Sequence, residues 1–389
     1  MADLLPALAH EDVQLTLLTP RLTGGEPVEQ PAPAVHVIRV PTAHTQIGSF
    51  PDYVAAVNED LVQAALHLEQ SFDMIHTHDW MTAHAAIALQ QRWNTPLVAT
   101  IHATERGRGR GHLRSEQAFQ IDGIERWLTH TAQRLIVCSQ HMAAEVTACF
   151  GIRAEQIDVI PNAVYVQPNP FTSDTERLEF RRRYAADDER LAFFIGRVVD
   201  EKGVHILIDA WAQVVQQVAA RLVLAGHGPL FENCKAHAAH LGLESRISFP
   251  GRITDEERSQ FYRAADVAVF PSIYEPFGIV ALEAQAAQCP VVVSATGGLQ
   301  EIVRPTTTGI RRTTCQRRVA GVGIAAQPCS IHTGRMPVRT MPSRDLENDL
   351  QLGACCPPDD CHLSACAGNV AAAHLTNGSL TSGHLLSRI

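Results

Sequence analysis

Glu275 and Glu283 stand eight positions apart around a Pro-Phe-Gly turn, and they are the first residues whose types and spacing suggest chemistry. Eight residues is slightly more than two helical turns, so one continuous helix would place both carboxylates on one face. Pro276 and Gly278 indicate instead that Glu275 lies on a loop after the strand-like residues 266–272, and that Glu283 lies in the next helix. The spacing alone favours a solvated turn and an ordinary surface glutamate, so the neighbouring residues decide the interpretation.

The start of this predicted helix suits an anion. The backbone N–H groups of Gly278, Ile279 and Val280 would stand at its N-terminus, where unpaired donors and the helix dipole favour a phosphate. Carboxylates beside a phosphate cradle fit a ligand that carries both hydroxyl and phosphate groups. Such a ligand is a nucleotide sugar.

A second loop carries paired positive charges between two glycines. The loop follows one predicted strand and precedes the next predicted helix. It contains Gly196, Arg197, Lys202 and Gly203. A guanidinium suits bidentate phosphate recognition and an ammonium supplies a point charge, so together they could neutralise a leaving diphosphate. A solvated loop is the alternative, and it is weakened because Lys202 and Lys235 are the only lysines in the chain.

Polar residues also follow two predicted strands of the N-terminal half. His102 ends the strand at 97–102, where an imidazole can donate to a sugar or polarise a reacting centre, although a locally satisfied histidine is the simpler interpretation. Asp79 and Trp80 follow the strand at 74–78, and they could accept from sugar hydroxyls and stack on a ring face. A metal site at His76 and His78 is a weaker interpretation, because alternate residues share a face only while the strand stays regular.

Strands and helices alternate from about residue 13 to residue 303, which predicts an α/β protein with parallel sheets covered by helices. A Pro-, Ser-, Thr- and Asn-rich stretch at 167–176 predicts a linker. We therefore expect an N-terminal domain at 1–166, a C-terminal domain at 177–310 and a separate segment at 311–389. Ligands of such sheets bind at the carboxyl ends of the strands.

Composition narrows the class of protein. The chain has 389 residues, 46% apolar and 19% charged, which is enough for two packed domains. A net charge of −9 without a basic block in the first 300 residues argues against a nucleic-acid partner. No apolar run has the length of a membrane span and no secretory signal is visible, so we expect a cytoplasmic protein whose oligomeric state is open. Cys138, Cys149, Cys234 and Cys289 are scattered and predict small core residues.

Four motifs together resemble a known family. They are Glu-x7-Glu with Glu-Pro-Phe-Gly at 275–283, Gly-Arg-x4-Lys-Gly at 196–203, His-Thr-His-Asp-Trp at 76–80 and Ile-Pro-Asn at 160–162. The combination is similar to the group 1 (GT4) glycosyltransferases of the GT-B fold, and to their glycogen and starch synthase-like branch in particular. The resemblance implies two Rossmann-like domains that close over a nucleotide-diphosphate sugar of the ADP- or UDP-glucose type. It also implies transfer to a carbohydrate acceptor with retention of configuration, without a metal or other cofactor.

The resemblance also implies roles for individual residues. Glu275 would touch the donor sugar, Arg197 and Lys202 would stabilise the leaving diphosphate, His102 would lie over the donor sugar, and Asp79 would orient the sugar or the acceptor. The residues that the resemblance assigns to donor binding are Gly196, Phe277, Gly278, Ile279, Val280 and Glu283, of which Glu283 would hold the ribose hydroxyls.

The sequence departs from the family pattern in three places. The family has a first strand and a glycine-rich loop before a helix similar to residues 2–9, which stand here at the start of the chain. Ala163 replaces a glycine after Ile-Pro-Asn, which is costly where positive φ is needed. The resemblance ends near Ile310, and residues 311–389 lack helical or strand periodicity and carry six cysteines. We interpret this segment as the product of a reading-frame shift that does not fold onto the body; a zinc or redox module is the rival interpretation.

Two other functions stay open at this point. An inactive fragment of such an enzyme would share every motif while lacking the first strand. A nucleotide-binding dehydrogenase would use Gly226 and Gly228, but the Gly-x-Gly-x-x-Gly fingerprint lacks its third glycine there.

Overall fold

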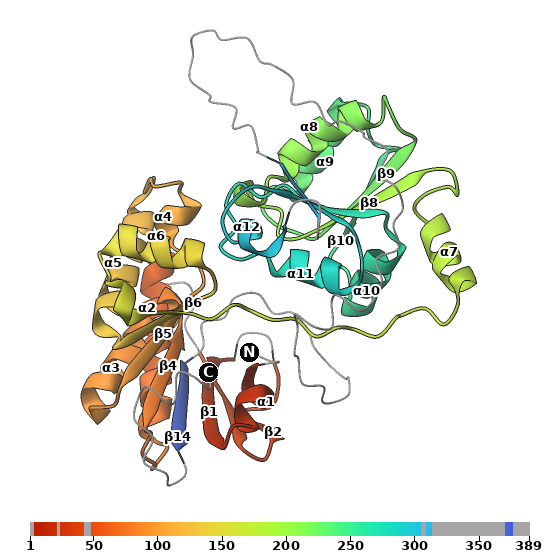
Figure 1. Cartoon of the computed structure of the whole chain (residues 1–389). Helices are drawn as coiled ribbons and strands as arrows, with labels where there is room; N and C mark the ends of the chain where they lie inside the picture. The colour runs from red at the N-terminus through yellow and green to blue at the C-terminus, as the bar shows by residue number, and fades with distance from the viewer. Residues whose placement is uncertain (1–3, 22–23, 43–47, 305–308, 313–369, 376–389) are drawn as a thin grey trace, which may run out of the picture. The chain divides into compact units, whose positions relative to one another are not determined.

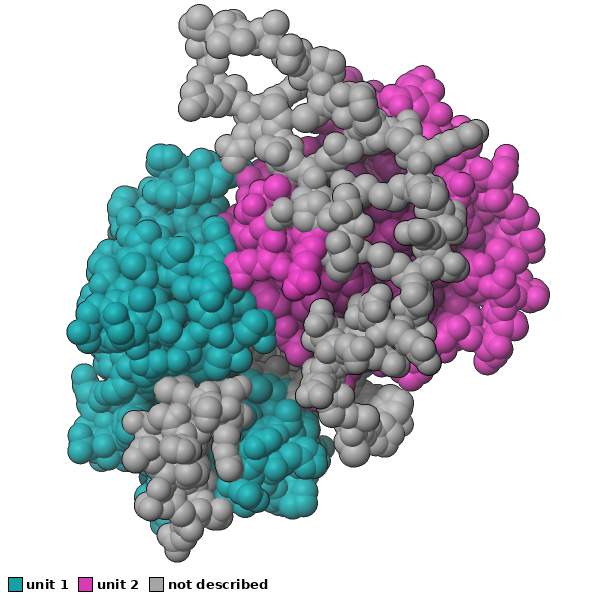
Figure 2. Space-filling model, in the orientation of Figure 1, with its two compact units in different colours: residues 1–161, 361–389 teal, residues 162–360 magenta. Residues whose placement is uncertain are grey.

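The computed structural model describes residues 4–21, 24–42, 48–304, 309–312 and 370–375. The chain forms two compact units (Figure 2), which are Met1–Pro161 with Cys361–Ile389, and Asn162–Asp360. The division falls at Pro161, a few residues before the expected linker at 167–176. Among the described residues, no helix is long and apolar enough to cross a membrane.

The first unit is built on an eight-stranded sheet with the order β2-β3-β1-β14-β4-β5-β6-β7 (Figure 1). Its strands are β1 Val13–Pro20, β2 Val28–Ala32, β3 Val35–Val40, β4 Met74–His78, β5 Leu97–Ile101, β6 Arg134–Val137, β7 Ile157–Val159 and β14 Val370–Leu375. The run from β4 to β7 is parallel throughout, and all five residues of β5 are buried. Burial on both faces explains why this strand reads as a continuous apolar run.

The longest helices of the first unit, α2 Phe50–Leu66 and α5 Glu116–Thr131, begin at side-chain caps, as does α6 Gln140–Phe150. The other helices are α1 Leu4–Ala9, α3 Ala83–Trp93 and α4 Glu105–Arg108, with short 3-10 turns η1 Trp80–Thr82 and η2 Ala154–Gln156. Ser49 and Asp52 form a capping box at α2, and Ser115 and Ser139 cap α5 and α6. Gly151 ends α6 in the left-handed conformation.

The segment after residue 310 differs from expectation in two places. Ile310–Arg312 forms β13, and Val370–Leu375 forms β14, which pairs antiparallel with both β1 and β4. The sequence of β14 is alanine-rich, with Val370 as its one β-branched residue and no aromatic residue of the kind that favours a strand, so local pattern does not predict it. The expected cysteine cluster and the remainder of this segment lie outside the described residues.

The second unit contains a six-stranded parallel sheet with the order β10-β9-β8-β11-β12-β13. The strands are β8 Arg190–Ile195, β9 Ala220–Ala225, β10 Ile247–Gly251, β11 Val267–Phe270, β12 Val291–Ser294 and β13. The helices are α7 Asp174–Arg182, α8 Val204–Val214, α9 Phe231–His240, α10 Asp255–Ala264, α11 Ile279–Ala286 and α12 Leu299–Ile302, with η3 at Asp200–Lys202. The prediction of an α/β protein with parallel sheets is confirmed, except that β2 and β14 pair antiparallel with their neighbours in the first sheet.

Buried aromatic side chains pack on β8 and β11, the two central strands of this second sheet. Phe193 on β8 stacks on Phe261 of α10 at 4.8 Å between ring centroids, and Phe194 and Phe270 are also fully buried. Removing a buried phenylalanine side chain typically costs about 3–5 kcal/mol. Strands β8 and β11 pair directly with each other, so their carboxyl ends, and the loops that follow them, are neighbours.

Candidate functional site

The loops after β8 and β11 bring Lys202 and Glu275 into contact. Lys202 Nζ donates to Glu275 Oε2 over 2.7 Å, and Ser272 Oγ donates to the same oxygen over 3.0 Å. The Glu275 side chain is only 9% exposed and that of Lys202 21%, so the pair is largely withdrawn from water. A buried carboxylate needs such a partner, because an uncompensated charge in this position is strongly unfavourable.

Backbone contacts fix the two loops against each other. The carbonyl of Glu201 accepts from the backbone N–H of Ile273 at 2.8 Å and of Tyr274 at 3.3 Å. Gly203 has φ +65°, and a Cβ there would lie 2.2 Å from the carbonyl oxygen of Pro271. Only glycine allows this approach, which explains why the Lys-Gly pair places the ammonium beside Glu275.

Helix α11 begins after Gly278, as the sequence predicts. Gly278 has φ +104°, and a Cβ there would lie 2.4 Å from Leu299 Cδ2, so the position requires glycine. No side chain caps this helix among the described residues, and the helix starts at Ile279. The backbone N–H of Gly298 donates to the carbonyl of Glu275 at 2.9 Å and ties this loop to the start of α12. The site therefore combines a buried ion pair with a helix N-terminus.

Arg197 does not join the ion pair. Its side chain is 58% exposed, and its Nη2 donates to Glu201 Oε1 at 3.3 Å. Arg197 therefore stands at the solvent side of the loop that carries Lys202.

The glycines after β9 have a packing role. A Cβ at Gly226 would lie 1.8 Å from the carbonyl oxygen of Gly196, and one at Gly228 would lie 2.4 Å from that of Val198. Gly226 also has φ +124°, which only glycine adopts readily. These glycines let the β8 and β9 loops pack against each other. Packing therefore explains why glycine is found at both positions, without a dinucleotide fingerprint.

Asp79 of the first unit has a strained backbone. It follows β4 with φ 57° and ψ −176°, a region that costs a non-glycine residue on the order of 1–3 kcal/mol and that is concentrated at functional sites. Its Oδ1 accepts from the backbone N–H of His102 at 2.8 Å, and its own N–H donates to the carbonyl of Thr100 at 2.9 Å. The structure thus brings together the two residues that the sequence singled out at the ends of β4 and β5.

Three imidazoles stack beside this contact. His76 and His78 lie 4.5 Å apart and His78 and His102 lie 5.3 Å apart between ring centroids, and His78 Nδ1 is 3.0 Å from His102 Nε2. Burial lowers the pKa of His76 to about 4 and that of His78 well below its usual value, so both rings are neutral at physiological pH. Within the described ranges, no group of three or more His, Cys, Asp or Glu side chains is arranged to hold a metal ion.

Comparison with known proteins identifies the family. Residues 1–163 match the model of the glycosyl transferase 4-like domain, and residues 176–315 match the model of glycosyl transferases group 1. A D-inositol 3-phosphate glycosyltransferase of Pseudarthrobacter chlorophenolicus is 30% identical over 324 residues, which are 79% of this chain and 76% of the relative. The chain belongs to the group 1 glycosyltransferases.

Other members of the family are longer than the matched region. An uncharacterised glycosyltransferase of Methanocaldococcus jannaschii is 37% identical over 61% of this chain and 62% of its own length. A glycogen synthase of Mycobacterium tuberculosis is 35% identical over 71% of this chain and 66% of its own length. The chain thus spans just under two thirds of these two relatives.

Solved structures of related glycosyltransferases have the same fold. Sucrose-phosphate synthase of Thermosynechococcus elongatus superposes with a TM-score of 0.68 at 26% identity, covering 80% of this chain and 78% of the other. The HepE protein of Anabaena, solved in complex with UDP-glucose, superposes with a TM-score of 0.58 at 26% identity, covering 71% and 72%. The predicted GT-B architecture is therefore confirmed.

Glu283 lies apart from the Lys202–Glu275 ion pair. Its Oε2 accepts from Tyr262 Oη at 3.2 Å and lies 3.8 Å from Arg258 Nε. Burial raises the pKa of Glu283, and the nearby Arg258 opposes this rise. The sequence did not single out Tyr262 and Arg258; their spacing of four residues on α10 places them on one helix face and is the only signal for them.

Sequence reasoning also missed Glu125 on α5. This side chain is buried, and both of its oxygens accept from the backbone N–H of Glu105, at 2.9 and 3.0 Å. Burial raises the pKa of Glu125 to about 8, and the negative charge of Asp79 adds to the effect. Nothing in the local sequence distinguishes Glu125 from the surface glutamates of the same helix.

The alanine at position 163 carries no backbone penalty in this chain. Ala163 is not among the described non-glycine residues with positive φ. The cost expected for the loss of a glycine therefore does not arise, because the chain leaves Pro161 without a left-handed residue at this point.

Proposed function

We propose that this chain transfers a sugar, glucose in the first instance, from a nucleotide-diphosphate sugar to a carbohydrate acceptor with retention of configuration. The observation that carries the proposal is the buried Lys202–Glu275 pair beside the uncapped N-terminus of α11. A cation, a carboxylate and free backbone donors are the groups that a phosphorylated sugar requires. The binding of UDP-glucose by HepE supports a donor of this class.

Each residue has a distinct task in this proposal. Glu275 accepts hydrogen bonds from the hydroxyls of the donor sugar, and Gly278, Ile279 and Val280 donate their backbone N–H groups to the diphosphate. Lys202 leaves Glu275 in part to meet the diphosphate, and the exposed Arg197 adds a second positive charge as negative charge develops on the leaving group. Glu283 binds the ribose hydroxyls, and no metal ion takes part.

The reaction breaks one bond and forms another at the same carbon. The bond from the anomeric carbon to the diphosphate oxygen breaks, and a bond to the acceptor hydroxyl oxygen forms on the same face. The proton of that hydroxyl leaves with the nucleoside diphosphate. His102 and Asp79 orient the sugar in this scheme, and the neutral stack of His76 and His78 keeps the His102 ring in place.

Release of nucleoside diphosphate tests the proposal. Purified chain is incubated with UDP-glucose or ADP-glucose, with and without glycogen, and released UDP or ADP is measured. We expect Glu275→Gln to lower turnover by about 100-fold or more, because it removes a charged group from the site where charge develops. Asp209→Asn is the matched control, since Asp209 lies on α8 and pairs only with His237 among the described contacts.

Two outcomes contradict the proposal. Folded wild-type chain that releases no nucleoside diphosphate from either donor is the result expected of an inactive fragment. Equal turnover in Glu275→Gln and Asp209→Asn would remove Glu275 from the reaction.

A further inference from the structure

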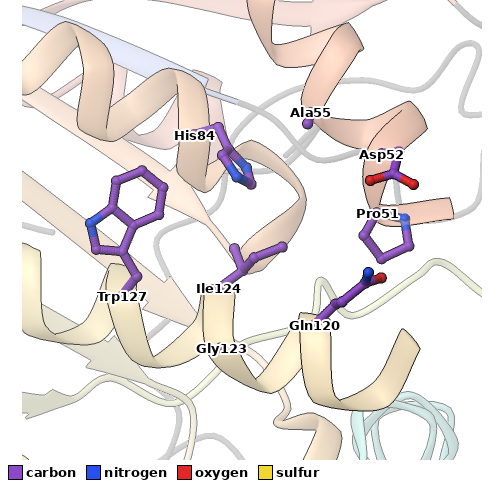
Figure 3. Close-up of a pocket in the computed structure, with 8 residues that line it drawn as sticks. All are labelled: Pro51, Asp52, Ala55, His84, Gln120, Gly123, Ile124 and Trp127. Atoms are coloured by element: carbon purple, nitrogen blue, oxygen red, sulfur yellow. The ribbon is translucent and has the colours of Figure 1, made fainter. Parts of the chain in front are cut away.

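A groove outside this site opens on the first unit. It has a volume of about 290 Å³ and lies between the first turns of α2 and α3 and the middle of α5 (Figure 3). The residues that line it are Pro51, Asp52, Ala55, His84, Gln120, Gly123, Ile124 and Trp127. The volume is at the lower end of small-molecule sites, which start at about 300 Å³, so it fits one ring rather than a whole nucleotide sugar.

The lining selects a neutral ligand with hydroxyl groups. No lysine or arginine lines the groove, and the carboxylate of Asp52 stands at its edge, so a phosphate or another anion is disfavoured. Ser49 donates to Asp52 through both its N–H and its Oγ and lowers the pKa of Asp52, which therefore accepts hydrogen bonds as a carboxylate. The amide of Gln120, 3.3 Å from Ser49 Oγ, adds donor and acceptor atoms next to it.

Trp127 provides a flat apolar surface at the other end of the groove. Its side chain is 43% exposed, although a tryptophan is one of the most costly residues to leave in water. The ring of His84 contacts it at 5.4 Å between centroids in an edge arrangement of 70°, so the indole is already held in place. A ligand that stacks on a fixed ring loses less entropy on binding than one that must order it.

His84 contributes a neutral ring to the lining of the groove. Within the described residues its Nδ1 is buried and has no hydrogen-bond partner. Burial also lowers the pKa of His84, so the ring is neutral and offers one donor and one acceptor nitrogen. Because Nδ1 is not accessible to solvent, a ligand in the groove would meet the neutral ring of His84 and would not bond to this atom.

Gly123 is, beside the exposed Trp127, another independent sign of a ligand. It lies in the interior of α5, where glycine is a poorer helix former than alanine. A Cβ at Gly123 would meet no atom within 4 Å, so packing gives no reason for the missing side chain. The glycine keeps the groove open between Gln120 and Trp127, one turn of the helix on each side.

We propose that this groove binds one pyranose unit of a neutral glycan. The sugar ring stacks on Trp127 while its hydroxyls bond to the amide of Gln120 and the carboxylate of Asp52. The inference rests on the proposed function only for the ligand class, since a carbohydrate acceptor supplies such units. The groove would hold part of a long acceptor away from the reacting end.

Binding of maltoheptaose to the full chain tests the inference. Affinity is measured by isothermal titration calorimetry for wild type, Gly123→Leu and Trp127→Ala. We expect both variants to lose affinity about tenfold or more, because leucine fills the groove and alanine removes the stacking surface. Gly123→Leu should keep or raise the thermal midpoint, since leucine is a better helix former than glycine. Phe119→Ala is the matched control, because Phe119 is an exposed ring, 62% accessible, on the same helix outside the groove.

The outcomes separate this inference from the proposed function. Unchanged affinity in Gly123→Leu and Trp127→Ala, or no binding of maltoheptaose by wild type, would overturn the groove as a sugar site. Self-association of wild type that Trp127→Ala abolishes in sedimentation equilibrium would assign the groove to a second copy and would also overturn it. Groove-dependent binding in a chain that releases no nucleoside diphosphate would leave the inference standing and the transferase function refuted.

Discussion

At the scale of the residue, the ammonium of Lys202 and the carboxylate of Glu275 stabilise each other in a place where either charge alone would be costly. The sequence pointed to both residues, because each lies in a loop after a predicted strand, with Gly203 next to Lys202 and Gly278 three residues after Glu275. It could not show that Lys202, and not Arg197, makes the contact. That choice depends on the backbone bonds from Ile273 and Tyr274 to Glu201, which join segments about 70 residues apart.

Lys202→Met separates the structural role of this ion pair from its chemistry. The substitution leaves Glu275 buried and unpaired, so we expect the free energy of unfolding of the second unit to fall by about 3 kcal/mol. The double variant Lys202→Met with Glu275→Gln should recover most of this loss, because no unpaired charge remains. Urea unfolding of the wild type, both single variants and the double variant measures the coupling.

Arg197→Met is the control for that experiment. Arg197 forms an exposed pair with Glu201, and such pairs contribute less than about 1 kcal/mol. We expect nearly unchanged stability but a fall in nucleoside diphosphate release. A loss of stability as large as that of Lys202→Met would show that the two cations have the same structural role.

Asp79 has both a positive φ and a side chain that accepts a hydrogen bond from the His102 N–H, so substitutions there test both features. Asp79→Ala removes the acceptor of the His102 N–H and keeps the positive φ, so we expect a loss of about 1–3 kcal/mol. Asp79→Asn retains a side-chain oxygen and tolerates positive φ, so stability should stay close to that of wild type. Thermal unfolding of both variants checks this expectation, and equal losses in Ala and Asn would contradict it.

At the scale of the element, helix α5 serves two purposes that its sequence does not reveal. Its buried side carries Glu125 against the start of α4, and its exposed side carries Gly123 and Trp127 at the groove. The helix itself was predictable from its period and its Ser115 cap. Which of its polar residues is buried depends on packing with α4, which no local pattern encodes. The same holds for Tyr262 and Arg258 on α10, which meet Glu283 only through the fold.

The buried carboxyl of Glu125 predicts a pH dependence of stability. Its pKa is about 8 in the folded chain and near 4.5 when exposed, so the folded state binds a proton that the unfolded state has lost between these values. The contribution of Glu125 to stability is therefore fully present below pH 4.5 and is lost as pH rises to about 8. Glu125→Gln should remove this loss and be more stable than wild type at pH 8 by a few kcal/mol, at about 1.4 kcal/mol per pKa unit.

Unfolding by urea at several pH values between 5 and 8.5 checks the expectation for Glu125. The pKa of His76 falls to about 4 on folding, so this residue lowers the free energy of unfolding as pH falls, which is the opposite of the effect of Glu125. His76 is present in both proteins. The difference between wild type and Glu125→Gln therefore isolates the glutamate. Parallel stability curves for the two proteins would show that Glu125 is ionised in the folded chain.

At the scale of the whole molecule, the alternation of strands and helices, the two-part division and the family were all readable from the sequence. Periodicity and strand-end motifs depend only on residues that are close together in the sequence, so they can be recognised without the structure. The place of β14 in the first sheet was not readable, because it joins residues 370–375 to strands more than 290 positions earlier. A strand that pairs on both sides can form from an alanine-rich run when two neighbouring edges supply the hydrogen bonds.

A truncation tests whether β14 supports the first unit. A chain that ends at residue 360 would leave the facing edges of β1 and β4 unpaired, and unpaired strand edges promote aggregation and local opening. We expect faster amide hydrogen exchange in β1 and β4, a lower thermal midpoint of the first unit and unchanged exchange in β8 and β11. A chain that ends at Leu375 keeps β14 and is the matched control. Equal exchange in β1 and β4 of the two truncated chains would mean that these strands are stable without β14, and that the sheet tolerates an open position at its centre.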